Sequence, residues 1–218
     1  MNELFEALRQ SIIDGLPDIA HSHALDALQQ GLDPLETINT ACLPAMDYVG
    51  EKFGCHDMFL PDVLMASEAM KAAISVLEPE MQRRGGQRQT MGKVVLGTVR
   101  GDIHEIGKSL VAIMLSAAGF EVFDLGISVP TETFAAKARE LGADVVGVSA
   151  LLTTTMAVQK KVIECFDREG LRPRVKVIVG GAPVTRKWAE EIGADGYGKD
   201  AASAVSLVKS LLKTAASG

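Results

Sequence analysis

A histidine in a glycine-containing segment is the residue whose surroundings best suit chemistry. Residues 101–109 read GDIHEIGKS and follow a short β-branched run at residues 94–96. Asp102 lies two positions before His104, so its carboxylate could hold one ring nitrogen and leave the other nitrogen free. Histidines that bind metals commonly donate their second N–H to a carboxylate in this way. The pair therefore predicts a metal ligand with a supporting acid.

Two other interpretations of this segment compete with a metal site. The phosphate-loop pattern G-x-x-x-x-G-K-[ST] almost fits, but five residues separate Gly101 from Gly107, and two acidic side chains would face the phosphate. Alternatively, His104 could simply cap the next helix. Its neighbouring carboxylate, the flanking glycines and its place after a strand, where such sheets bind ligands, favour the metal interpretation over both.

The kind of metal site is limited by the number of ligands. No second histidine or cysteine lies near His104, so the protein would supply one ligand, whereas a bare zinc or iron ion needs more. A macrocycle that already fills the equatorial positions of its metal would need only one. This indicates a cobalt corrinoid or a haem, and haem has no obvious place in the fold expected below.

The elements that position this segment are predicted from hydrophobic periodicity. From residue 93 onward, short β-branched runs alternate with helical segments, which predicts right-handed crossovers and a parallel sheet covered on both faces. We expect an α/β fold, a flavodoxin-like five-stranded parallel sheet, in residues 93–218. The predicted strands lie near residues 94–96, 121–123, 145–148, 175–179 and 196–197.

The first part of the chain reads as helices only, and we expect an all-α four-helix domain over residues 1–88. One helix is expected from about residue 4, a second over residues 18–30 and a third from Asp33-Pro34. We expect the third helix to bend or restart near Pro44. A turn over residues 53–60 leads to a fourth helix from Pro61 to about residue 78. Residues 83–89 are polar and aperiodic, which predicts a linker, and we place its bounds at about residues 83–92.

Composition excludes several classes of protein. The formal net charge is −6, with no long basic run, which disfavours nucleic acid as a partner. No apolar stretch suggests a membrane span, and the mixed-charge N-terminus is not a signal peptide. The cysteines at 42, 55 and 165 form no C-x-x-C, so we expect a reducing, cytoplasmic location.

The spacing of the chemical residues resembles a known family. The pattern D-x-H-x-x-G, then S-x-L, then G-G is similar to that of the cobalamin-binding module of methionine synthase, and still more to the free-standing corrinoid proteins of methanol, methylamine and betaine methyltransferase systems. Residues 50–53 (GEKF) and 58–61 (MFLP) match the helical cap of that family. The residues that carry the pattern are Asp102, His104, Gly107, Ser149, Leu151, Gly180 and Gly181.

The resemblance implies a role for each of these residues. His104 is expected to be the lower axial ligand of cobalt in a base-off/His-on cobalamin or related corrinoid, whose displaced lower base enters a slot in the sheet domain. Thr155 stands where methionine synthase has a serine that completes the hydrogen-bond chain of Asp102 and His104. The residues expected to border the tail are Gly107, Ser149, Leu151, Gly180 and Gly181, with Tyr197, Gly198 and Asp200 at its far end.

In the helical half, the resemblance implies that apolar side chains cover the upper face of the corrin. These are Phe53, Phe59, Leu60 and Val63, although the same residues could simply form the core of a helix bundle.

The implied function is methyl transfer between partners. Co(I) would accept a methyl group from a substrate held by a substrate-specific methyltransferase, and methyl-Co(III) would donate it to a second methyltransferase that uses tetrahydrofolate or a thiol. A reductive activase would be a third partner, and the chain itself would be a co-catalytic subunit. Two alternatives stay open, the corrinoid-binding subunit of a radical mutase and a cobalamin-dependent sensor. The methyl donor is not fixed by the sequence.

Overall fold

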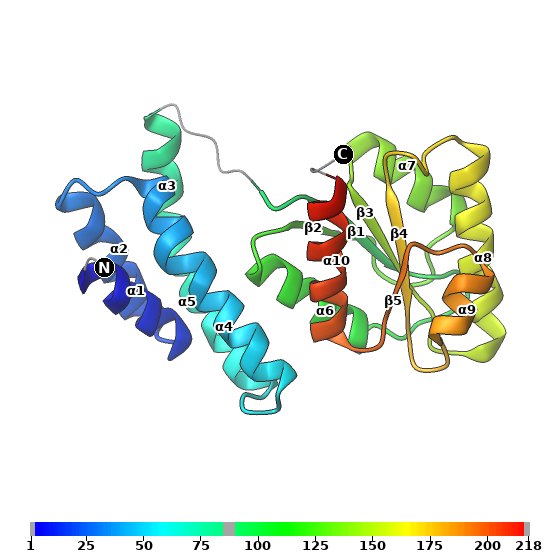
Figure 1. Cartoon of the computed structure of the whole chain (residues 1–218), viewed down its shortest axis with the longest axis horizontal. Helices are drawn as coiled ribbons and strands as arrows, with labels where there is room; N and C mark the ends of the chain where they lie inside the picture. The colour runs from blue at the N-terminus through cyan, green and yellow to red at the C-terminus, as the bar shows by residue number, and fades with distance from the viewer. Residues whose placement is uncertain (1–2, 85–89, 216–218) are drawn as a thin grey trace. The chain divides into compact units, whose positions relative to one another are not determined.

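The chain forms two compact units, described by a computed structural model over residues 3–84 and 90–215. An all-helical unit precedes residue 90, and an α/β unit begins at Thr90 (Figure 1). Arg83, placed in the predicted linker, still belongs to a helix, and residues 85–89 of that linker lie outside the described residues. Within the described segments, the structure contains no helix long and apolar enough to cross a membrane.

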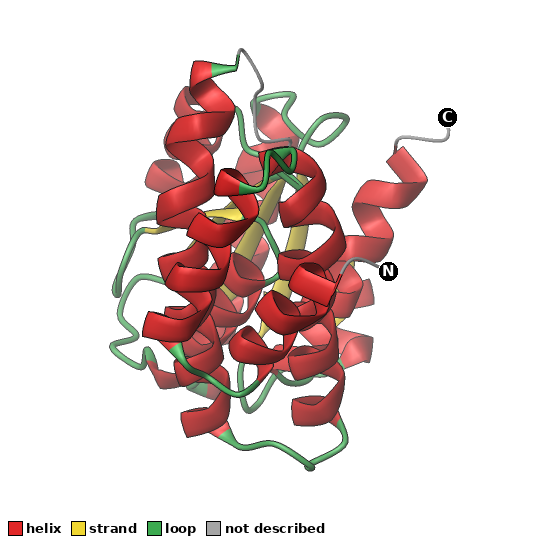
Figure 2. Cartoon of the chain, turned by 90° about the vertical axis from the view of Figure 1, so that its left-hand side faces the viewer, coloured by secondary structure: helices red, strands yellow, loops and turns green. Residues whose placement is uncertain are grey.

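The helical unit follows the predicted order of four helical segments. Its third segment is continuous but mixed, because α-helical turns flank a wider π-helical one. Helices predominate in the chain, as the red ribbons of Figure 2 show. The elements of this unit are α1 (Glu3–Ile13), α2 (Pro17–Gln29), α3 (Pro34–Thr37), the π-helix η1 (Ile38–Cys42), α4 (Leu43–Gly54) and α5 (Leu60–Arg83).

Local signals account for the third segment. The Asp33 carboxylate accepts a hydrogen bond from the Glu36 N–H at 2.9 Å, as expected of an N-cap. The predicted irregularity near Pro44 is the π-helical turn η1, in which the N–H of Leu43 donates to the carbonyl of Ile38. Pro44 has no N–H with which to continue the α-helical ladder, so the wider turn lies just before it.

Two predicted helix boundaries were wrong. The helix expected to end near residue 78 continues through Pro79 to Arg83. Leu77 and Met81 are both buried, so packing on either side of Pro79 outweighs the hydrogen bond that proline removes. The turn expected from residue 53 begins only at Cys55, because α4 includes Phe53 and Gly54.

The α/β unit has the predicted flavodoxin-like topology. Its five strands are all parallel and pair in the order β2-β1-β3-β4-β5. Figure 1 shows α6 and α10 on one side of the sheet and α7, α8 and α9 on the other. The elements are β1 (Lys93–Thr98), α6 (Ile106–Ala117), β2 (Glu121–Asp124), α7 (Thr131–Leu141), β3 (Val145–Ser149), α8 (Thr153–Arg168), β4 (Lys176–Gly180), α9 (Arg186–Glu191), β5 (Gly196–Gly198) and α10 (Ala201–Ala215).

The two faces of this sheet differ in the size of their side chains. On the side of α7 and α8, valines of the strands pack against the fully buried Phe134 and Phe166 in a continuous core. On the side of α6 and α10, three neighbouring strands each present a glycine, namely Gly147 of β3, Gly180 of β4 and Gly198 of β5. Because side chains alternate between faces along a strand, these glycines present no side chain on this face, and Leu96 lies over Gly147 while Ala204 lies close to Gly198.

Candidate functional site

The loop after β1 brings Asp102 and His104 together as predicted. Asp102 is completely buried, whereas the His104 side chain is 44% exposed. His104 Nδ1 lies 2.7 Å from Asp102 Oδ1, and the His104 backbone N–H donates to the same oxygen at 3.1 Å. A carboxylate can only accept, so it fixes the proton on Nδ1 and leaves the lone pair of Nε2 available to a metal.

The second oxygen of Asp102 is held by the loop that follows β3 and by the start of α8. Asp102 Oδ2 accepts hydrogen bonds from the N–H of Leu151 at 2.7 Å, the N–H of Leu152 at 3.2 Å and the Thr155 hydroxyl at 2.7 Å. Burial opposes the charge on this carboxyl, but hydrogen bonds from His104, Thr155 and Leu151 outweigh it and hold the pKa of Asp102 well below its usual range. Asp102 is therefore an anion that orients the imidazole.

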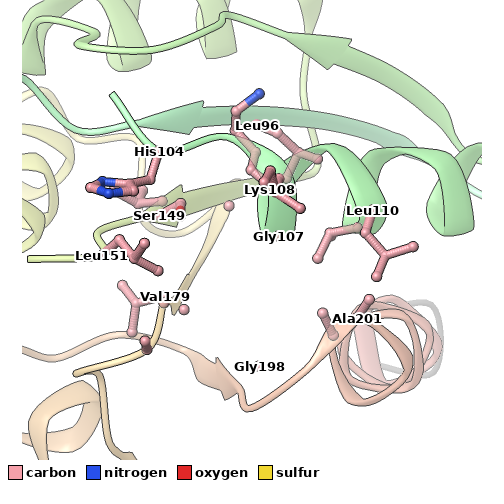
Figure 3. A pocket seen from close by; sticks show the side chains of 18 of the residues that line it. Leu96, His104, Gly107, Lys108, Leu110, Ser149, Leu151, Val179, Gly198 and Ala201 are labelled. Carbon is pink, nitrogen blue, oxygen red and sulfur yellow. The ribbon is translucent and has the colours of Figure 1, made fainter. Parts of the chain in front are cut away.

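A cavity of about 620 Å³ opens beside His104 between the sheet and the helices α6 and α10. Figure 3 shows His104, Ser149 and Leu151 at one end of it, and Leu110 and Ala201 toward the other. Its walls are mostly apolar, contributed by residues such as Leu96, Val111 and Ile178. Such a slot, with few polar groups, suits a flat heteroaromatic base.

The sheet register explains how the floor of the cavity forms. Thr98, Ser149, Gly180 and Gly198 pair directly across four neighbouring strands, so they share one face and one level at the carboxyl end of the sheet. This is the end at which sheets of this topology bind ligands. With two glycines in the row, the floor is open enough for a bulky group.

The predicted pair Gly180 and Gly181 lies where the backbones of neighbouring segments pack closely. A Cβ placed on Gly181 would lie 1.9 Å from the carbonyl oxygen of Ala150, and the φ of Gly181 is +124°. A Cβ on Gly180 would lie 3.1 Å from the Gly198 carbonyl oxygen. Gly107 differs, because a Cβ there meets no protein atom within 4 Å and would project into open space at the wall of the cavity. Gly180 and Gly181 therefore allow close backbone packing beside the slot, and Gly107 leaves space at its wall, which fits a large tail lying against the backbone.

Most of the predicted tail-binding residues line this one cavity. Beside the predicted ligand His104, they are Gly107, Ser149, Leu151, Gly180, Gly181, Gly198 and Asp200. Asp102 holds His104, and Thr155 in turn donates to Asp102. Tyr197 does not line the cavity. It packs against the core on the other face, because alternation along β5 directs it away from Gly198.

Several lining residues were not predicted from the sequence. Ala201 and Ala204 lie one turn apart on α10, a spacing that could have indicated a helix face kept small beside the cavity. Lys108 lines the wall with its stem, while its amino group forms an ion pair with Asp124 and points away from the cavity in Figure 3. Ile103 and Ile106, beside His104, are 70% and 84% exposed.

The predicted capping residues of the helical unit differ in exposure. Phe59 is 65% exposed and Leu60 38%, and Phe53 is partly buried. Val63 is 1% exposed, so its side chain belongs to the core of the helical unit, the alternative left open above. Exposed large apolar side chains suit a binding surface, which keeps Phe59 and Leu60 as candidates.

Comparison with known families now identifies the class of protein. Residues 92–206 match a family model described as a B12 binding domain, and residues 4–78 match a second model with the same description. The chain belongs to the B12-binding family of corrinoid proteins. This confirms the resemblance read from the sequence, and with it the corrinoid cofactor.

Relatives cover almost the whole of this corrinoid protein. It is 48% identical to trimethylamine corrinoid protein 2 of Methanosarcina acetivorans over 97% of this chain and 98% of that one. It is 46% identical to a corrinoid protein of Desulfitobacterium hafniense over 96% and 97%. Its structure resembles the methanol:cobalamin methyltransferase complex MtaBC from Methanosarcina barkeri with a TM-score of 0.87 and 29% identity, covering 97% of this chain and 80% of that one.

The donor groups of this corrinoid protein suit a metal that arrives inside a macrocycle. Across the described residues, no group of three or more histidine, cysteine, aspartate or glutamate side chains is arranged to hold a metal ion. One oriented imidazole beside a large apolar slot is what a corrinoid would need, since the macrocycle supplies the equatorial ligands.

Proposed function

We propose that this corrinoid protein carries methyl groups between partner methyltransferases, with Nε2 of His104 as the lower axial ligand of the cobalt. When bound, the corrinoid supplies a cobalt centre that can accept and release a methyl group. The observation that carries the proposal is the free Nε2 of His104 at the mouth of the cavity, fixed by a buried and fully hydrogen-bonded Asp102.

The residues of the chain have separable tasks in this proposal. Asp102 keeps the Nδ1 proton in place and orients the ring, and Thr155 and the amides after β3 keep Asp102 anionic. Ser149 offers a hydroxyl on the floor of the slot to the lower base, while Gly107, Gly180 and Gly181 leave room for it. This division would give a base-off/His-on state, because a lower base held in the slot could not also bind the cobalt.

Partners would supply the substrate specificity. The names of the relatives mention trimethylamine and dimethylamine, and the related complex is named a methanol:cobalamin methyltransferase, so methylamines are the first donors to test and methanol the next. We propose a substrate-specific methyltransferase as donor partner, a tetrahydrofolate- or thiol-dependent methyltransferase as acceptor partner, and a reductive activase. Phe59 and Leu60 of the helical unit would shield the reactive face of the corrin from water.

The first experiment tests His104 directly. The holo-protein is prepared with histidine labelled with the heavy nitrogen isotope, and the electron paramagnetic resonance (EPR) spectrum of its Co(II) form is recorded. We expect a splitting that changes with the label in the wild type and is lost in His104→Ala. His21→Ala, an exposed histidine on α2, should behave as wild type. A label-dependent splitting that persists in His104→Ala would refute the proposed ligand.

The second experiment tests the carrier role. Reduced holo-protein is mixed with candidate methyltransferases and methylamine, methanol or betaine donors while the cobalt absorption spectrum is followed. A change of the cobalt spectrum from the reduced to the methylated form with one pair of methyltransferase and donor supports the proposal. A protein that retains only an adenosyl corrinoid and reacts with none of these partners would instead favour a mutase subunit or a sensor.

A further inference from the structure

Two side chains outside the proposed ligand set hold the loop that carries His104. Thr98, the last residue of β1, is fully buried, and its hydroxyl donates to the backbone carbonyl of His104 at 2.9 Å. Ser128, which follows β2, holds the beginning of the loop. The N–H of Gly101 donates to Ser128 Oγ at 3.1 Å, and the N–H of Ser128 donates to the Asp102 carbonyl at 3.0 Å.

Packing does little to fix this loop. Ile103 is 70% exposed, the His104 side chain is 44% exposed, and Glu105 is also exposed. Only Asp102 among residues 102–105 is buried. Since apolar burial cannot set the position of an exposed segment, its hydrogen bonds must do so. The bonds from Thr98 and Ser128 add to the two that Asp102 Oδ1 accepts from His104, one from the ring and one from the backbone N–H.

The backbone of Ser128 gives independent support for a specific role. Its φ is +50°, a left-handed conformation that residues other than glycine rarely adopt. Two residues earlier, the positive φ of +83° is adopted by a glycine, Gly126, whereas at position 128 it is adopted by a serine. Ser128 adopts the strained conformation while both its hydroxyl and its N–H bond the loop, which fits strain retained at a functional position.

We propose that Thr98 and Ser128 are positioning residues for the axial ligand. They fix the backbone from Gly101 to His104, so that Nε2 is presented at the mouth of the cavity in one orientation. The inference rests on the proposed role of His104 as ligand. Functional groups act well only when held within about half an ångström of their productive geometry, so a loosened loop weakens ligation without removing any ligand.

The test compares two substitutions at Thr98. Thr98→Val keeps the volume of the side chain and removes the hydroxyl, whereas Thr98→Ser keeps the hydroxyl. In holo-protein with labelled histidine, we expect the equilibrium constant for His104 ligation to fall roughly three- to tenfold in Thr98→Val, the value of one hydrogen bond. The label-dependent splitting of the Co(II) spectrum should weaken accordingly, and Thr98→Ser should restore it.

Thr37 provides the matched control. It is also fully buried, and its hydroxyl donates to the Asp33 carbonyl at 2.8 Å within the helical unit. Thr37→Val therefore also removes a bond from a buried threonine hydroxyl to a backbone carbonyl, although the Asp33 carbonyl still accepts the N–H of Thr37 at 2.9 Å. Only Thr98→Val should alter the cobalt spectrum. An unchanged spectrum in folded Thr98→Val, or the same change in Thr37→Val, overturns the proposal for Thr98.

Ser128→Ala tests the other end of the loop and carries little risk of misfolding, because Ser128 is exposed. We expect a smaller weakening of the splitting in the same direction. If Thr98→Val does not fold, the Ser128→Ala variant becomes the test of the inference. A Co(II) spectrum of Ser128→Ala identical to that of the wild type would then overturn it. A wild-type holo-protein without any label-dependent splitting would instead refute the ligand role of His104, so the two failures are distinguishable.

Discussion

At the scale of single residues, the site depends on buried polar groups that are completely hydrogen bonded. Asp102 receives donors from two loops and from α8, so its charge is stabilised although it is fully buried. A second such group is Gln159, which is fully buried and joins the ends of β3 and β4. If Asp102 or Gln159 is replaced, its former hydrogen-bond partners are left unsatisfied while still buried, and the protein loses their full desolvation free energy.

Replacement of Asp102 by asparagine should destabilise the α/β unit and change its response to pH. The amide would face several N–H donors, so we expect a loss of about 3 kcal/mol at neutral pH. The pKa of Asp102 is lower in the folded state, so the unfolded chain takes up the proton first. Stability should therefore fall as pH drops below about 4, the pKa of an unperturbed aspartate, and this fall should be smaller in Asp102→Asn.

Denaturant titrations of the apo-protein between neutral and acidic pH measure this effect. Asp144→Asn is the control, because Asp144 also accepts a backbone hydrogen bond, from the N–H of Lys93 at 2.7 Å. Equal acid sensitivity in wild type and Asp102→Asn would contradict the assignment of a depressed pKa to Asp102.

Replacement of Gln159 by leucine should be visible in tryptophan fluorescence. Gln159 Nε2 donates to the carbonyls of Val148 and Gly180 at 2.9 and 3.1 Å, and its Oε1 accepts from Trp188 Nε1 at 3.0 Å. Trp188 is the one tryptophan of the chain. Gln159→Leu should cost about 2 kcal/mol and shift the emission of Trp188. Exposed Gln10→Leu should do neither, and unchanged emission in Gln159→Leu would exclude this network.

At the scale of elements, the slot exists because the small residues Ser149, Gly180 and Gly198 lie at one level of adjacent strands. Gly147, Gly180 and Gly198 face α6 and α10, whose own contributions to the wall include Gly107, Ala201 and Ala204. The opposite face carries valines and the aromatic side chains of α7 and α8. One sheet therefore supports a packed core on one side and a ligand cavity on the other.

Replacement of Gly181 by alanine should distort the slot where β3 and β4 end. Its Cβ would meet the Ala150 carbonyl oxygen at 1.9 Å, so β3 and β4 must separate where they end. We expect cobalamin affinity to fall at least about tenfold, measured by absorbance titration of the apo-protein. Gly170→Ala is the control, because its φ is also positive, at +66°, but its Cβ would meet nothing within 4 Å. Equal affinities of the two variants would contradict this account.

At the scale of the molecule, the chain combines two units with separate cores. The helical unit is built on alanines of α2 and α5, and the α/β unit on the aromatic and valine core beside its sheet. Ser149, the slot glycines and the loop of His104 all belong to the second unit. Corrinoid binding should therefore raise the unfolding temperature of the α/β unit.

Calorimetry should show a corrinoid-dependent unfolding transition for the α/β unit. A ligand that binds only the folded state stabilises it by about 2.7 kcal/mol at a hundredfold excess over Kd. We expect the midpoint of this transition to rise with cobalamin concentration, and to rise less in Gly181→Ala. A midpoint that does not respond to saturating cobalamin would be incompatible with the slot as the binding site.

The sequence by itself determined the class of fold and predicted that Asp102 and His104 act as a pair. Alternating β-branched runs and helical segments predicted the parallel sheet, because strand and helix periods are local properties of the chain. The spacing of Asp102 and His104 predicted a ligand with its supporting acid, since two residues on one loop need no tertiary information to meet. The long-range pattern through Gly180 and Gly181 indicated the cofactor family.

Only the tertiary structure decided which residues line the slot and which hold it. Thr98 lies six residues before His104, and Ser128 lies in another crossover, so their hydrogen bonds depend on how β1 and β2 end side by side. Val63 and Tyr197 could be placed only once the core-facing side of α5 and of β5 was known. Burial and register arise from contacts between distant segments, and a linear pattern does not specify them.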